Sequence, residues 1–230
     1  MTLCLICARK GSKRLPNKNL RTINGISLLG IAINHAKSCS EIEEIIVSTD
    51  CHEISAEAKK FGAKVPFLRP AELGQDTTPE WSVWQHTLNF YKNLMPNKLI
   101  VLPTTAPLRK KEDIQSAIHI FDSNVCDGVI TVTDSHRSPS FNIVKENNNK
   151  YLELAIKNSN KVYRSQDDQK YYDITTVCYV MNSAFVLKKN HMFDGNLKLN
   201  YVPKERSVDI DTELDLDWAI FLYNHNKIIN

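Results

Sequence analysis

The sequence lacks any apolar run long enough to cross a membrane, since its longest apolar runs have the length of strands. It also has no low-complexity tail and no internal repeat. Of its 230 residues, 42% are hydrophobic and 24% are charged, the composition of an ordinary globular protein. We therefore expect one domain over residues 1–230 that does not bind a membrane. A short apolar run precedes the first basic residues, the reverse of the order in a signal peptide, so we expect a cytoplasmic protein.

Cysteine and histidine show none of the spacings that bind metals or build a disulfide framework. Among the six cysteines, Cys4 and Cys7 form a CxxC, but no second pair follows. Residues three apart on a strand also face opposite ways. The seven histidines have no metal-ligand spacing, and no Ser/His/Asp nucleophile arrangement is apparent. We expect buried, reduced thiols in a cytosolic protein.

The net charge of +3 is too small to predict nucleic-acid binding, but the charges are unevenly distributed. The first forty residues contain basic residues and no Asp or Glu, whereas acidic residues crowd together between positions 205 and 217. A polyanion-binding loop and a carboxylate cluster on one chain indicate a phosphate substrate and a divalent cation.

Strand-like and helix-like patterns alternate along most of the chain. Strands are expected at residues 3–8, 44–48, 98–102, 128–133 and 207–210, and helices at residues 28–37, 53–61, 79–91, 112–121 and 213–223. This alternation predicts a Rossmann-like α/β fold, with a mostly parallel sheet flanked by helices. Trp81, Trp84 and Leu88 recur at helical spacing, which is more typical of core positions than of a base-stacking platform.

The pattern changes between about residues 134 and 172. This stretch is polar, and the Asn147-Asn148-Asn149 turn separates two short strand candidates. We expect a small hairpin lobe, an excursion from the domain that meets a partner subunit.

The basic residues lie in a loop that follows the first strand directly and reads ARKGSKRLPNKNL. Gly11 lets the backbone approach a ligand closely, and cations with exposed N–H groups suit phosphates. Open α/β sheets bind ligands beyond the carboxyl ends of their strands, which is where this loop lies. It is neither a GxGxxG nor a P-loop, which argues against dinucleotide and Walker-type sites.

The acidic segment reads SVDIDTELDL from Ser207. On a strand, Asp209 and Asp211 would face the same side, with Ile210 turned into the core. Two carboxylates so close repel each other unless a cation or a proton lies between them, and Mg²⁺ prefers such oxygen ligands. Thr212 with Asp215 three residues on is instead typical of a helix start.

Taken in order, these segments resemble the acylneuraminate cytidylyltransferase family, which comprises CMP-sialic, CMP-legionaminic and CMP-pseudaminic acid synthetases. The basic loop is similar to the family's nucleotide-binding signature, and NGISLLG, IIVSTD, RPAEL, DT, TTAPLR and DIDTELDL follow at similar spacing over almost the whole chain. The resemblance implies an enzyme that transfers CMP from CTP to an acidic nine-carbon 2-keto sugar of the sialic or legionaminic type and releases pyrophosphate. It also implies a Mg²⁺ (or Mn²⁺) cofactor and a homodimer.

The resemblance further implies roles for matching positions. The CTP phosphates would be held by Arg9, Ser12, Lys13 and Lys18, and the cytidine by Asn19 and Arg69. Asp209 and Asp211 would hold the metal, and Arg9 and Lys13 would stabilise the leaving pyrophosphate, which makes these four the catalytic residues. Asp50, at the end of its strand, would face the pocket or cap the following helix.

On the sugar side, the implied residues are Leu102, Thr104, Asn142, Arg164 and Gln166. Relatives of the sialic type tend to have a polar residue where Leu102 stands and Asn-Gly where Thr175-Thr176 stands. A leucine at the pocket rim would favour a legionaminic-type acceptor, unless it faces the core. Two alternatives remain open: a cytidylyltransferase for 3-deoxy-manno-octulosonate, and a non-catalytic nucleotide-binding protein of the same fold.

Overall fold

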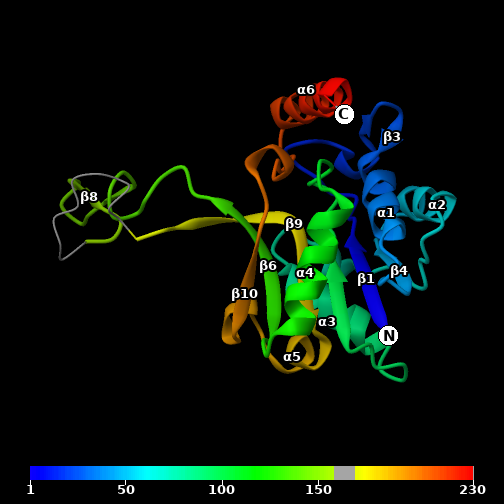
Figure 1. Cartoon of the computed structure of the whole chain (residues 1–230). Helices are drawn as coiled ribbons and strands as arrows, with labels where there is room; N and C mark the ends of the chain where they lie inside the picture. Colours follow the sequence, from blue (N-terminus) through cyan, green and yellow to red (C-terminus); the bar gives the residue numbers. More distant parts are fainter. Residues whose placement is uncertain (158–168, 230) are drawn as a thin grey trace.

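A computed structural model describes residues 1–157 and 169–229, and within them a six-stranded sheet forms the centre of the molecule (Figure 1). The strands lie in the order β10 (Leu197–Tyr201), β6 (Gly128–Asp134), β9 (Tyr172–Asn182), β5 (Lys98–Val101), β1 (Thr2–Cys7) and β4 (Glu44–Ser48). Strand β1 pairs in parallel with β4 and β5, and β10 with β6, whereas β9 runs antiparallel to both of its neighbours. The predicted Rossmann-like, mostly parallel sheet is confirmed. Apolar side chains on both faces of β1 explain why it occupies an inner position.

Helices cover both faces of the sheet. One face packs against α1 (Leu28–Ser38), α2 (His52–Lys60) and α4 (Lys111–Ser123), and the other against α3 (Glu80–Phe90) and α5 (Ser183–Lys188). Helix α1 begins where the Ser27 hydroxyl accepts a hydrogen bond from the Gly30 N–H, and α2 is followed by Gly62 at φ +88°, as expected of a helix stop. Trp81, Trp84 and Leu88 are buried in the second core, as predicted.

A third apolar cluster joins the C-terminal helix α6 (Glu213–Ile229) to the segment after the basic loop. That segment contains the short helix η1 (Lys18–Leu20) and the ribbon of β2 (Thr22–Ile23) and β3 (Ile26–Ser27). Figure 1 shows α6 lying beyond one end of the sheet, next to β3. The two ends of the chain that carry most of the candidate residues are therefore packed together.

One predicted strand is wrong. Residues 207–210 do not form a strand: they follow the short helix η5 (Lys204–Arg206), and the Ile210 N–H donates to the Thr105 carbonyl in a loop. Four of the expected strands occur in the sheet, and its other two strands are β9 and β10. Helix α3 begins at Glu80, directly after Pro79, and the Thr78 hydroxyl donates to the Glu72 carbonyl.

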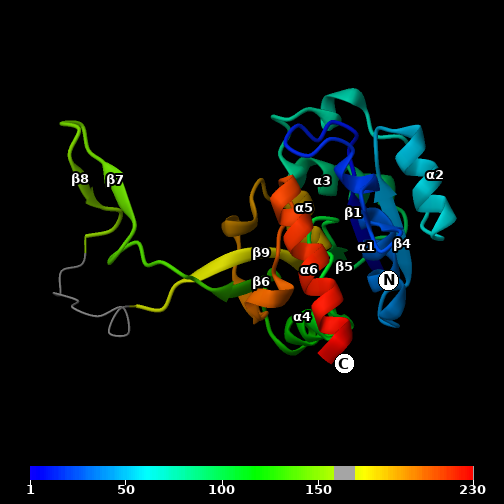
Figure 2. The same ribbon diagram turned by 90° about the horizontal axis from the view of Figure 1, so that it is seen from above.

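The excursion forms the expected hairpin. Strands β7 (Val144–Glu146) and β8 (Leu152–Leu154) pair antiparallel, and the Asn147 side chain accepts the N–H groups of Asn149 and Tyr151 across the turn. Figures 1 and 2 show this hairpin standing away from the body of the molecule. The remaining short helices, η2 (Ala71–Gly74) and η4 (Met192–Asp194), belong to the body.

All six cysteines are free, and four of them are buried, as predicted for structural thiols. None of the helices in the described residues is long and apolar enough to span a membrane.

Candidate active site

A cleft of about 570 Å³ opens beyond the carboxyl ends of β1 and β5, where the sheet topology predicts a ligand site. A smaller cavity of about 230 Å³ adjoins it. Four residues line both: Cys7, Arg9, Asp76 and Glu80. The main cleft brings together Arg9, Ser12, Lys13, Lys18, Asn19, Thr104, Asp209 and Asp211 from the sequence predictions.

The basic loop is tied down at its backbone. The Asp50 carboxylate accepts the Lys10 N–H at 2.8 Å, so Asp50 neither faces the cleft nor caps α2. The Asn19 amide, which is buried, donates to the Arg9 carbonyl at 2.8 Å and accepts from the Thr104 hydroxyl at 2.7 Å. Because these contacts use both ends of the Asn19 side chain, its evident role here is to hold the loop against the strand-end loop that carries Thr104.

Asp76 neutralises two of the predicted phosphate ligands. Its carboxylate lies 2.5 Å from the Arg9 guanidinium and also pairs with Lys13. Hydrogen bonds from Lys13 and then Arg9 hold the pKa of Asp76 below its usual range. Asp76 is far from the basic loop in the chain, so the sequence gives no signal for this contact.

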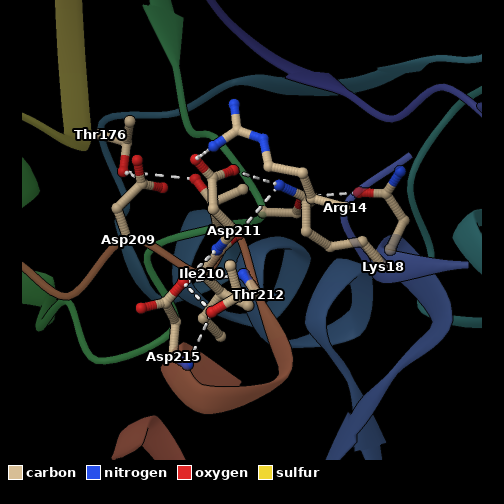
Figure 3. Close-up of polar contacts among 11 residues, drawn as sticks. Arg14, Lys18, Thr176, Asp209, Ile210, Asp211, Thr212 and Asp215 are labelled. Carbon is tan, nitrogen blue, oxygen red and sulfur yellow. Dashed lines mark hydrogen bonds and ion pairs between the residues drawn. The ribbon is translucent and has the colours of Figure 1, made fainter. Parts of the chain in front are cut away.

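Asp211 receives two cations from the same loop (Figure 3). Arg14 contacts one carboxylate oxygen at 2.7 Å, and Lys18 contacts the other at 3.0 Å. Lys18 also donates to the Ile210 carbonyl at 2.9 Å. The basic loop and the acidic segment are therefore joined by ion pairs.

Asp209 has a different environment. Its carboxylate is exposed and accepts a hydrogen bond from the Thr176 hydroxyl at 3.1 Å. Ile210, between the two aspartates, is fully buried, so both carboxylates face the cleft as predicted, although their backbone is not a strand. Thr212 and Asp215 form the predicted helix start, with the Thr212 N–H donating to Asp215 at 2.7 Å and the Asp215 N–H to Thr212 at 3.3 Å.

Arg69 lines the smaller cavity and not the main cleft. It is 6% exposed, and its guanidinium donates to the Ser48 carbonyl at 2.7 Å and to the Ser48 hydroxyl at 3.2 Å. Arg69 is therefore not a surface arginine. The structure does not bring Asn19 into this cavity, so the two residues expected at the cytidine are separated.

The predicted sugar residues are the least well gathered. Leu102 is fully buried in the core beneath α1 and α4 and does not line the cleft, so its expected place at the pocket rim is wrong. Asn142 lines a separate cavity of about 390 Å³ at the root of the hairpin lobe, and its side chain accepts the Ser138 N–H. Arg164 and Gln166 lie outside the described residues.

Two arginines that hold segments behind the cleft were not among the predicted residues. Arg109 is 2% exposed and donates to the carbonyls of Pro103 and Ala106, which fixes the loop that presents Thr104. Burial lowers the pKa of Arg109 to about 10. Arg206 forms a two-point ion pair with Asp113 at 2.7 and 2.9 Å, which anchors the start of the acidic segment on α4. A sequence shows the charges of such residues but not the partners that they contact in the fold.

Comparison with known proteins agrees with this geometry. The sequence model of the cytidylyltransferase family matches residues 3–225. The chain is 34% identical to the post-translational flagellin modification protein B of Campylobacter coli, over 98% of this chain and 96% of that protein. It is 35% identical to the CMP-N,N'-diacetyllegionaminic acid synthase of Campylobacter jejuni, over 96% and 94% of the two chains. It is 30% identical to the pseudaminic acid cytidylyltransferase of the same species, over 97% of each.

Among solved structures, the fold is similar to that of a CMP:2-keto-3-deoxy-manno-octonic acid synthetase complexed with CTP. The TM-score is 0.74 and the sequence identity 16%, and the match covers 98% of this chain and 99% of that one.

Proposed function

The chain belongs to the cytidylyltransferase family, and from this premise we propose that it transfers CMP from CTP to an acidic nine-carbon 2-keto sugar. The anomeric hydroxyl attacks the α-phosphorus of CTP in line, the bond to the β-phosphate oxygen breaks, and pyrophosphate leaves. The observation that carries the proposal is the main cleft, which places cations of one loop opposite two carboxylates of another at the carboxyl ends of the strands.

The nucleotide would occupy both cavities. Arg9 borders the main cleft and the smaller cavity, so the triphosphate would lie across Arg9, Ser12, Lys13 and Lys18, with the base toward Arg69. Arg9 and Lys13 would stabilise the charge that develops on the leaving pyrophosphate, after exchanging Asp76 for phosphate oxygens. Asn19 would contribute by holding the loop in place.

The donor set of the cleft fits a divalent cation of the Mg²⁺ or Mn²⁺ type. Asp209 and Asp211 offer carboxylate oxygens to one space. No group of three or more His, Cys, Asp or Glu residues in the described residues could hold a metal by itself, so water and substrate phosphates would have to complete its shell. Mg²⁺ typically takes one or two carboxylates and completes its shell with water and substrate phosphates. When bound, the cation would neutralise charge on the phosphate oxygens and lower the pKa of the attacking hydroxyl. Asp209 and Asp211 would hold it.

The names of the relatives support an acceptor of the legionaminic or pseudaminic type. Leu102 gives no support for that choice, because it faces the core. On the sugar side of the cleft, Thr104 is the predicted residue that lines the space. Asn142 lines the separate cavity at the root of the lobe, so it would contact an acceptor only if the lobe itself lay against the bound acceptor.

A homodimer would give the lobe a partner. The hairpin exposes Tyr151 and Leu152 at 73% and 71%, and the adjoining strand exposes Ile174. Apolar side chains gathered on a projecting element are typical of an interface. A second copy of the chain would cover them, with the lobe of one subunit lying against the other.

The six free thiols of the chain and its nucleotide substrate favour a cytoplasmic location.

Pyrophosphate release tests the proposal. The protein would be given CTP, ATP, GTP or UTP together with legionaminic, pseudaminic, N-acetylneuraminic or 3-deoxy-manno-octulosonic acid, with Mg²⁺ or with EDTA. We expect release with CTP, with a nine-carbon acid and with Mg²⁺. Equal rates with all four nucleotides would contradict base recognition by the Arg69 cavity, and release with the eight-carbon acid alone would assign the alternative acceptor. No release with any acid would indicate a binding protein of the same fold.

A further inference from the structure

The Thr176 hydroxyl lies between the acidic segment and the strand-end loop (Figure 3). It accepts a hydrogen bond from the Thr105 hydroxyl at 3.3 Å and donates to the Asp209 carboxylate at 3.1 Å. A hydroxyl has one proton to donate, so with Thr105 donating to it, the Thr176 proton is directed at Asp209. All three residues line the main cleft.

An irregularity in β9 brings Thr176 to this place. Strand β9 pairs with β6 at Tyr179–Ile130 and next at Ile174–Val132. Between these two pairs the chain advances by five residues on β9 but by only two on β6. The surplus residues form a bulge. Bulges bend a strand and re-aim its side chains, and they are frequent beside active sites.

The bulge is held from inside by Thr131. Its hydroxyl accepts the Cys178 N–H at 3.0 Å and donates to the Cys178 carbonyl at 2.9 Å. The consecutive residues Val177 and Cys178 are both fully buried in the same apolar cluster, which a regular strand with alternating faces does not allow. The bulge is thus anchored on both sides, and the direction of Thr176 is fixed by packing.

We propose that Thr176 is a positioning residue that orients the Asp209 carboxylate for a divalent cation. Partners of this kind, one step removed from a metal, typically change metal affinity by about 10–100-fold when they are removed. The inference rests on the proposed function only in that Asp209 holds the cation.

Removal of the hydroxyl tests it. Thr176→Val keeps the size and β-branching of the side chain, whereas Thr176→Ser keeps the hydroxyl; Thr22→Val, at an exposed position on β2, is the matched control. Mn²⁺ binding would be titrated by electron paramagnetic resonance, with and without CTP, and Asp209→Asn would identify the site that is being titrated. We expect the Mn²⁺ Kd of Thr176→Val to rise about 10–100-fold, and those of Thr176→Ser and Thr22→Val to stay near wild type.

In kinetic assays, the substitution should change the dependence on metal but not the affinity for the nucleotide. For Thr176→Val, the apparent KM for Mg²⁺ should rise while the metal-free Kd for CTP stays unchanged, because the Thr176 hydroxyl bonds to Thr105 and Asp209. A change in thermal stability alone, with an unchanged Mn²⁺ Kd, would overturn the proposal and leave Thr176 with a structural role. An equal loss in Thr176→Ser would also overturn it, since the hydroxyl would then not be the active group.

The outcome is separate from that of the proposed function. Wild-type protein that releases pyrophosphate from CTP while Thr176→Val binds Mn²⁺ normally would refute this inference alone. Wild-type protein that releases none would refute the proposed function, and the Mn²⁺ titration would still decide the role of Thr176. Mn²⁺ binding that Asp209→Asn does not weaken would overturn the inference as well.

Discussion

Substitution of Leu102 distinguishes a core residue from an acceptor contact. Leu102 follows β5, is fully buried, and packs in the apolar cluster that also contains Ala106 and Ile114. Leu102→Gln would lose about 1.5–3 kcal/mol of buried apolar side chain and would add about 1–3 kcal/mol for an amide without partners. The expected destabilisation is therefore about 2.5–6 kcal/mol. For a chain of this length, about 2–4 °C of Tm correspond to each kcal/mol, so Tm should fall by roughly 5–24 °C.

Thermal unfolding followed by circular dichroism would measure this fall. Leu94→Gln is the matched control, because Leu94 is 62% exposed and the same change there should leave Tm nearly constant. Folded Leu102→Gln protein, assayed below its Tm, should keep the acceptor preference of the wild type. An unchanged Tm combined with an altered ratio of kcat/KM between acceptors would refute the placement of Leu102 in the core.

Three further predictions concern charges and assembly. Asp209→Asn and Asp211→Asn should each lower kcat by about 10²-fold or more while Asp217→Asn, on the exposed side of α6, does not; near-normal turnover in both would remove the metal site. Asp76→Asn should tighten CTP binding, measured by calorimetry, by roughly threefold to tenfold, because Arg9 and Lys13 would no longer have to leave weak, exposed ion pairs with Asp76 to bind phosphate. Weaker binding would mean that Asp76 chiefly shapes the loop. Sedimentation should give a dimer that Leu152→Ser weakens, and a fully active monomer would contradict the assembly.

The parts of the fold that the sequence predicts well are those whose apolar pattern reports burial directly. The run that forms β1 is buried on both faces, and β4 has the predicted bounds because EIIVS is apolar and bounded by polar residues. The position of the basic loop follows from β1, since a loop after an inner parallel strand lies at the ligand-binding edge. Most of the residues predicted at the cleft therefore line it.

The errors arise where the apolar pattern of the sequence does not report which residues are buried. Strand β10, LKLNY, lies at the edge of the sheet and is mostly exposed, so it has little apolar signal, whereas SVDI carries the alternation of a strand without pairing as one. Neighbouring positions at a strand end face opposite sides of the sheet, so an error of one residue in the strand end is enough to place Leu102 at the cleft and not in the core. Contacts between distant segments, such as Asp76 with Arg9, have no signal in one sequence at all.

The pairing of charges in the cleft has a consequence for how substrates enter. The cations of the basic loop are already neutralised by Asp76 and Asp211, so a triphosphate that binds alone must leave these carboxylates unpaired in a shared space. A divalent cation that binds alone must likewise displace Arg14 and Lys18 from Asp211. When both arrive, the loop cations pass to phosphate and Asp211 passes to the metal, so that Asp211 is not left without a partner. The same ion pairs thus favour joint over separate binding of nucleotide and metal, because separate binding leaves more charges unpaired.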